Sequence, residues 1–130
     1  MRHLPFIINF CAGALFLVLG LSGYASPHWF FNQKYDVLMP TPQSVTILRV
    51  MMGFMGTIGL LWLAASFFCS DQRRLLASTA LLTFGLVLSR LGGLILDGAN
   101  QHFTYIELSF EVFALIVTLI VFLKTPKTSK

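Results

Sequence analysis

The stretch "PFIINFCAGALFLVLGLSGY", residues 5–24, determines the class of this protein. It contains no Asp, Glu, Lys, Arg or His. Its length matches the roughly 20 apolar residues that an α-helix needs to cross the hydrocarbon core of a bilayer. We therefore expect residues 5–24 to form a transmembrane helix.

Three further segments have the same character, and we predict spans over residues 43–68, 75–96 and 104–123. Polar and helix-breaking stretches separate them: a loop over 25–42, "CSDQRR", "DGANQH" and a polar tail over 124–130. Only 11% of the 130 residues are charged, against about 25% in soluble domains. The sequence predicts one all-α membrane domain over residues 1–130, a four-helix transmembrane bundle with up-down-up-down topology.

The distribution of Lys and Arg predicts the orientation of the spans. With a cytoplasmic N-terminus, the inner side holds Arg2, Arg73, Arg74, Lys124, Lys127 and Lys130. The outer side holds only Lys34, Arg49 and Arg90. We therefore expect a multi-pass protein of a bacterial inner membrane with both termini in the cytoplasm and 25–42 as an outer loop. The N-terminal stretch also resembles a secretory signal ending in "SGYAS", but its apolar part is longer than a typical signal core.

Several classes of function find no support in the sequence. The net charge of +4 comes without the aromatic-basic interleaving of a nucleic-acid interface, so we expect no nucleic-acid partner. Cys11 and Cys69 are isolated and lack metal or redox spacing, and we interpret them as small apolar fillers. No metal-binding or cofactor motif is present, and we expect neither a metal nor a cofactor.

Five ionisable residues at the ends of the predicted spans suggest a site. They are Arg49, Arg90, Asp97, Glu107 and Glu111. At about 1.5 Å of rise per residue, all five fall in one layer of the outer leaflet. Charges at such depth are unfavourable by several kcal/mol unless they are paired or hydrated. The sequence therefore predicts that two arginines and three carboxylates gather there.

Helical spacing assigns these charges to helix faces that also carry small residues. Arg90, Gly93 and Asp97 share a face of the third span. Arg49 shares a face with Gly53 and Gly56, and Glu107 shares one with Glu111. Because small residues let membrane helices approach closely, we expect these faces to point at one another and Gly53, Gly56 and Gly93 to be packing positions. Asn9 in the first span is expected to donate an interhelical hydrogen bond.

The stretches "LRVMMGFMGTIGL" and "LSRLGGLILDG", followed by a span that begins with two glutamates, resemble the small bacterial four-helix membrane proteins of the family domain of unknown function 4345. The resemblance covers about residues 5–123. The matching positions are Arg49, Gly53, Arg90, Gly93, Asp97, Gly98, and Glu107 or Glu111. It implies a four-helix membrane fold and carries no known activity.

Four interpretations of the charges stay open. They could be a purely structural lock between helices. They could form a pocket for a lipid headgroup or an amphipathic small molecule, in which Arg49 and Arg90 hold an anionic group, or the bundle could be an accessory subunit of a membrane complex. An intramembrane isomerase or hydrolase would use Glu107 or Glu111 as acid and base. A transporter or channel would need a homo-oligomer, because four helices leave no room for a pathway.

Overall fold

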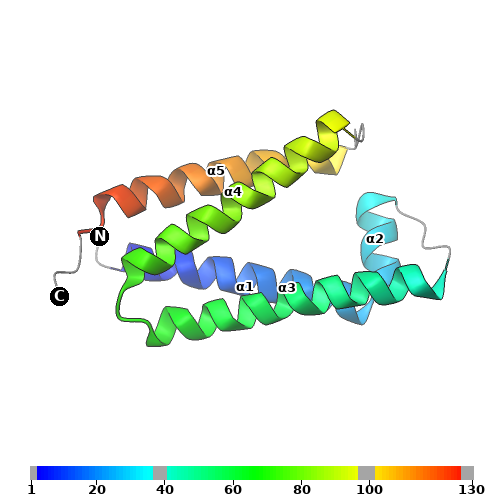
Figure 1. Cartoon of the computed structure of the whole chain (residues 1–130), viewed down its shortest axis with the longest axis horizontal. Coiled ribbons are helices and arrows are strands. Elements are labelled where there is room, and N and C mark those ends of the chain that lie inside the picture. Colours follow the sequence, from blue (N-terminus) through cyan, green and yellow to red (C-terminus); the bar gives the residue numbers. More distant parts are fainter. Residues whose placement is uncertain (1–2, 37–40, 97–101, 127–130) are drawn as a thin grey trace. The chain divides into compact units, whose positions relative to one another are not determined.

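A computed structural model describes residues 3–36, 41–96 and 102–126, and these residues contain five α-helices and no strand (Figure 1). The helices are α1 (Leu4–Ala25), α2 (Pro27–Tyr35), α3 (Pro42–Phe68), α4 (Gln72–Leu96) and α5 (His102–Lys124). All but α2 are long and apolar enough to cross a membrane, which confirms the prediction of an all-α protein with four such helices. The orientation of the termini stays a prediction.

The helix α2 lies in the segment 25–42, which we had expected to be a loop. Pro27 occupies its first turn, where the fixed φ of proline favours a helix and the missing N–H costs no hydrogen bond. Asp36 ends the helix in the left-handed conformation, with φ of 51°, and its N–H donates to the Asn32 carbonyl at 3.0 Å. With 9 residues, α2 is too short to span a bilayer.

The chain forms two compact units. The first, residues 10–68, holds most of α1 together with α2 and α3, and we call it the α1–α3 unit. The second, residues 1–9 and 69–130, holds α4, α5 and the first residues of α1, and we call it the α4–α5 unit. The boundary between the units therefore falls inside a helix, after Asn9.

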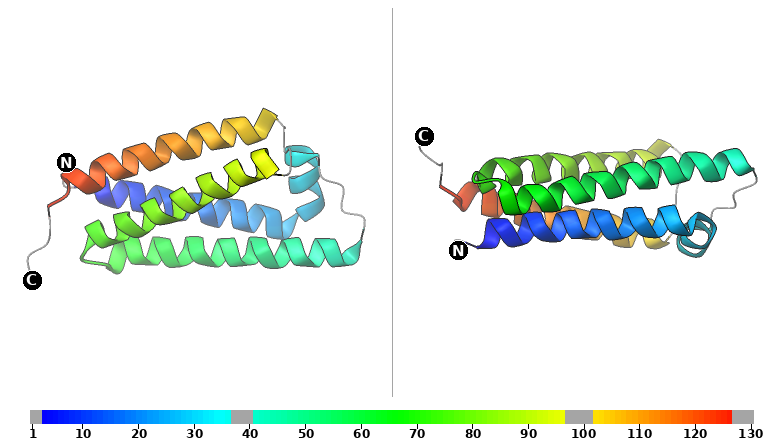
Figure 2. Two further views of the ribbon diagram at one scale, coloured as in Figure 1. Left: turned by 45° about the horizontal axis from the view of Figure 1, so that its top comes forward. Right: turned by 90° about the horizontal axis from the view of Figure 1, so that it is seen from below.

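In the α1–α3 unit, α1 and α3 run antiparallel beside each other, and glycines set their close approach (Figures 1 and 2). A Cβ atom on Gly20 would overlap the backbone of Gly56 and lie 2.8 Å from the Met52 carbonyl oxygen. A Cβ atom on Gly59 would lie 2.8 Å from the Gly13 carbonyl oxygen. Both helices therefore depend on glycine at these positions, as small-residue packing in membranes predicts.

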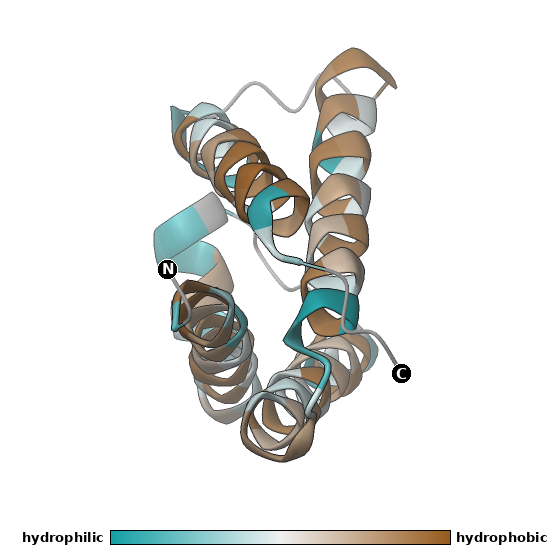
Figure 3. Cartoon of the chain, turned by 90° about the vertical axis from the view of Figure 1, so that its left-hand side faces the viewer, coloured by the Kyte–Doolittle hydropathy of each residue, from teal (hydrophilic) through white to brown (hydrophobic). Residues whose placement is uncertain are grey.

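In the α4–α5 unit, α4 and α5 pack against each other along their lengths. Leu76 of α4 is fully buried, and Val87 and Val121 are nearly so. Most large apolar side chains of the four long helices are instead exposed, and Figure 3 shows their hydrophobic colour along the helices. Such an exposed apolar surface suits a lipid environment.

Candidate functional site

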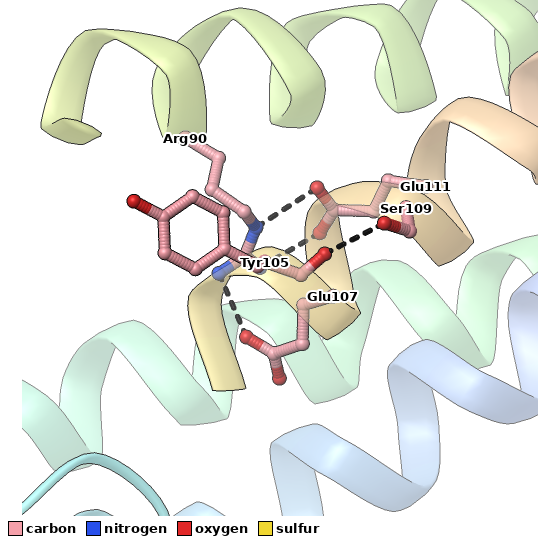
Figure 4. A network of polar contacts seen from close by, with 5 residues as sticks. All are labelled: Arg90, Tyr105, Glu107, Ser109 and Glu111. Carbon is pink, nitrogen blue, oxygen red and sulfur yellow. Dashed lines mark hydrogen bonds and ion pairs between the residues drawn. The ribbon is translucent and has the colours of Figure 1, made fainter. Parts of the chain in front are cut away.

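Arg90 of α4 and the two glutamates of α5 meet in one ion cluster (Figure 4). Arg90 Nε donates to Glu111 Oε2 at 2.9 Å, and Nη2 donates to Glu111 Oε1 at 2.7 Å. Arg90 Nη1 donates to Glu107 Oε2 at 2.7 Å. One guanidinium thus bridges two carboxylates, and its contact with Glu111 is bidentate. We call Arg90, Glu107 and Glu111 the ion cluster.

The positions of these residues along their helices explain why they meet. Glu107 and Glu111 are four residues apart, so their side chains lie on one face of α5. Arg90 lies six residues before the end of α4, and Glu107 lies five residues after the start of α5. At about 1.5 Å per residue, Arg90 and Glu107 are roughly 9 Å and 8 Å from the helix ends that the connection 97–101 joins. The antiparallel helices therefore place them at the same level.

The ion cluster is shielded but still reachable from outside. The side chains of Arg90, Glu107 and Glu111 are 22%, 18% and 13% exposed. Two carboxylates provide about eight acceptor positions, whereas a guanidinium has five N–H donors. Even if Arg90 used every donor on the glutamates, acceptor positions would remain for other donors. The cluster itself carries more negative than positive charge.

Arg90 contacts the two glutamates in different ways. Glu111 accepts two charge-assisted hydrogen bonds in the fork geometry that stabilises the ionised carboxylate. Glu107 accepts one such bond from Arg90. Of the pair, Glu111 is therefore the stronger anchor for Arg90.

The other two charged residues predicted at this site are not placed in it. Arg49 belongs to α3, in the α1–α3 unit, and is exposed. Its contribution to the site stays a prediction. Asp97, with the neighbouring Gly98, lies outside the described residues. The sequence-based expectation is thus met within α4 and α5 for three of the five charges.

Two of the small residues expected to share a helix face with Arg49 lie against α1. The ring of Tyr24, on α1, lies 3.5 Å from where a Cβ atom of Gly53 would be. Gly56 lies against Gly20, also on α1. This part of α3 therefore packs on α1. The expectation that the face also points at the third and fourth spans stays a prediction. Gly93 is half-buried on α4.

A second polar cluster lies near the start of α4, and the sequence analysis predicted one of its three members, Asn9. The fully buried Asn9 donates from Nδ2 to Gln72 Oε1 at 3.1 Å, which confirms its predicted hydrogen bond to another helix. Thr79 Oγ1 donates to Asn9 Oδ1 at 2.9 Å. The sequence did not identify Gln72 and Thr79 as the partners of Asn9, because single polar residues of this kind are common in helices. The three side chains satisfy one another and hold residues up to Asn9 against α4.

Comparison with known proteins finds one family. The model of the family described as "Domain of unknown function (DUF4345)" matches residues 6–122, which is most of the chain. No curated protein and no solved structure matches the chain.

Proposed function

Since the chain belongs to this DUF4345 family, whose description assigns no activity, we propose from the ion cluster that it is a membrane protein that binds the polar headgroup of a lipid or of another amphipathic small molecule. The site would be Arg90, Glu107 and Glu111, opening to the outer leaflet of a bacterial inner membrane. The same surface could serve a protein partner if the chain is an accessory subunit of a membrane complex.

One observation supports this proposal most directly. Three ionised side chains, joined at 2.7–2.9 Å and 13–22% exposed, lie in helices long and apolar enough to cross a membrane. Charged groups inside a membrane are unfavourable by several kcal/mol and commonly mark functional sites. A single Arg–Glu pair would be enough to fix the register of α4 against α5. The second carboxylate and the incomplete burial are what a purely structural lock does not need.

The geometry also changes the role that the sequence suggested for Arg90. Its Nε, Nη1 and Nη2 atoms already donate to the two glutamates. An anionic ligand would have to compete with these contacts. A ligand with hydroxyl or amine groups would instead donate to the carboxylates, which have more acceptor positions than Arg90 has donors. We therefore favour a headgroup that presents hydrogen-bond donors to the two carboxylates of the ion cluster.

The rival proposals receive less support. An intramembrane enzyme would use Glu107 or Glu111 as its acid or base, and either carboxylate would first have to be released from Arg90. A transporter or channel would require a homo-oligomer. Neither role has a contact in the structure that favours it over ligand binding.

The proposal is tested by identifying what remains bound to the protein after purification in a mild detergent. Native mass spectrometry of the wild type is expected to reveal one retained lipid or small molecule that carries hydroxyl or amine groups. Glu107→Gln should lower its occupancy about tenfold, because one charge-assisted hydrogen bond contributes about 1.5–3 kcal/mol. Asp71→Asn is the matched control, since Asp71 is paired with Arg74 outside the cluster.

The proposal fails if Arg90→Gln and Glu107→Gln variants stay folded and retain the same molecule at the same occupancy. It also fails if the wild type retains no molecule after lipid extracts are supplied. Arg49→Gln in the same assay separately tests the sequence-based prediction that this arginine contributes to binding.

A further inference from the structure

Arg73 differs from every other arginine of the described chain in how its charge is accommodated. It is the second residue of α4 and is half-buried. Its guanidinium lies 4.6 Å from the centre of the Phe122 ring, near the end of α5. Arg74, its neighbour, is 77% exposed and paired with Asp71 at 2.9 Å. Asp71 therefore forms its ion pair with Arg74, whereas Arg73 contacts the face of the Phe122 ring.

The Nε atom of Arg73 lacks a hydrogen-bond partner among the described residues. It is buried and has no partner within residues 3–36, 41–96 and 102–126. Neither terminal nitrogen of Arg73 is among the buried side-chain atoms that lack a partner. Buried polar groups are normally hydrogen-bonded, so a buried Nε without a partner suggests that the side chain binds something outside the described residues. Since Nε is enclosed by protein, compensation of the charge has to come through the terminal nitrogens.

The surroundings of Arg73 favour an anion as the missing partner. The end of the α4–α5 unit that holds Arg73 also holds Arg74 and Lys124, against the single acid Asp71 within residues 69–76 and 120–126. The Phe122 ring covers the flat face of the guanidinium and leaves its edge available, which is the side that binds phosphate. Arg73 lies in the first turn of a helix that is long and apolar enough to cross a membrane, so its side chain would lie in the layer of lipid headgroups.

We propose that Arg73, held in place by Phe122, binds the phosphate of an anionic phospholipid at the membrane surface where α4 begins and α5 ends. This site is separate from the ion cluster and does not depend on the function proposed for it. Arg73 makes the direct contact, Phe122 positions it, and Arg74 and Lys124 add long-range attraction. Basic residues at the membrane surface each contribute about 1 kcal/mol to such attraction.

The test compares two arginines that are neighbours in sequence but differ in environment. The purified full-length chain is titrated with phosphatidylglycerol or phosphatidylcholine in a neutral detergent, and bound lipids are counted by native mass spectrometry. We expect one tightly bound phosphatidylglycerol and no equivalent phosphatidylcholine. Arg73→Gln should weaken the binding about tenfold, whereas Arg74→Gln should weaken it less than about threefold.

Two further variants keep the test decisive if Arg73→Gln fails to fold. Arg73→Lys keeps the charge but loses the planar fork, and Phe122→Leu keeps the apolar contact but loses the aromatic face; both should lower the affinity for phosphatidylglycerol. Equal effects of Arg73→Gln and Arg74→Gln, or equal binding of the two lipids, would overturn the proposal. Displacement of phosphatidylglycerol by millimolar inorganic phosphate would also overturn it, since the site would then be one for a free anion.

Discussion

Removing Arg90 should destabilise the protein more than removing either glutamate of the ion cluster. Arg90→Gln leaves two carboxylates, 18% and 13% exposed, without their shared counter-charge. Breaking a buried pair by deleting one partner costs about 3–5 kcal/mol. Because the carboxylates are not fully buried, we expect the lower end of this range, about 3 kcal/mol.

The two glutamates should differ from each other in the same measurement. Glu111→Gln removes the charge and one of the two bonds of the bidentate contact, since an amide oxygen can still accept from Arg90, and it leaves Arg90 paired with Glu107, so we expect a loss of about 2 kcal/mol. Glu107→Gln removes one charge and keeps an amide oxygen that can accept from Nη1, so we expect about 1 kcal/mol or less. The predicted order of destabilisation is Arg90, then Glu111, then Glu107.

The assay is reversible unfolding of the purified protein in mixed micelles or bicelles, with the free energy of unfolding measured for each single variant. The Arg90→Gln/Glu111→Gln double variant completes a double-mutant cycle, which isolates the energy of that pair. An Arg90→Gln loss below about 1 kcal/mol would refute the reasoning, because a surface ion pair contributes that little. So would a Glu107→Gln loss equal to or larger than that of Glu111→Gln.

Two other predictions concern packing and orientation. Gly20→Ala should separate α1 from α3 and lower the free energy of unfolding by about 1–3 kcal/mol, because the new Cβ meets the Gly56 backbone. Gly85→Ala is its matched control: no atom of another element lies within 4 Å of that Cβ position, and alanine should be neutral or stabilise the helix by up to about 1 kcal/mol. Similar losses for both variants would contradict this account. For orientation, a chain with Cys11 and Cys69 replaced by serine should react with a membrane-impermeant thiol reagent at Ser26→Cys in intact cells and at Ser70→Cys only after lysis; the reverse pattern would show that the termini are outside.

The sequence contained enough information for the long helices and for most of the ion cluster. Runs of apolar residues reveal a membrane span directly, because the bilayer sets its length. Glu107 and Glu111 could be paired by their spacing, and Arg90 could be matched to them by its distance from the connection between the two helices. These inferences use only positions along one helix or across one short connection.

The remaining features depend on which helices are neighbours, and hydropathy does not encode that. Gly53 and Gly56 were placed on one face correctly, but nothing local shows that this face packs on α1. Asn9 was expected to bond another helix, yet its partner Thr79 is 70 residues away along the chain. The helix α2 was not predicted because three prolines within residues 27–42 favoured a loop. Pro27 is instead the first residue of α2, a position where proline favours the start of a helix.

The place of Asn9 in the α4–α5 unit has a consequence for the order in which the protein is made. Residues 10–68 form one compact unit, so they can begin to pack as soon as α3 has been synthesised. The Asn9 side chain must wait for Thr79, and at about 5–20 residues per second that interval is roughly 4–14 s. During biogenesis the start of α1 therefore carries an amide with no partner while the rest of the helix is already engaged.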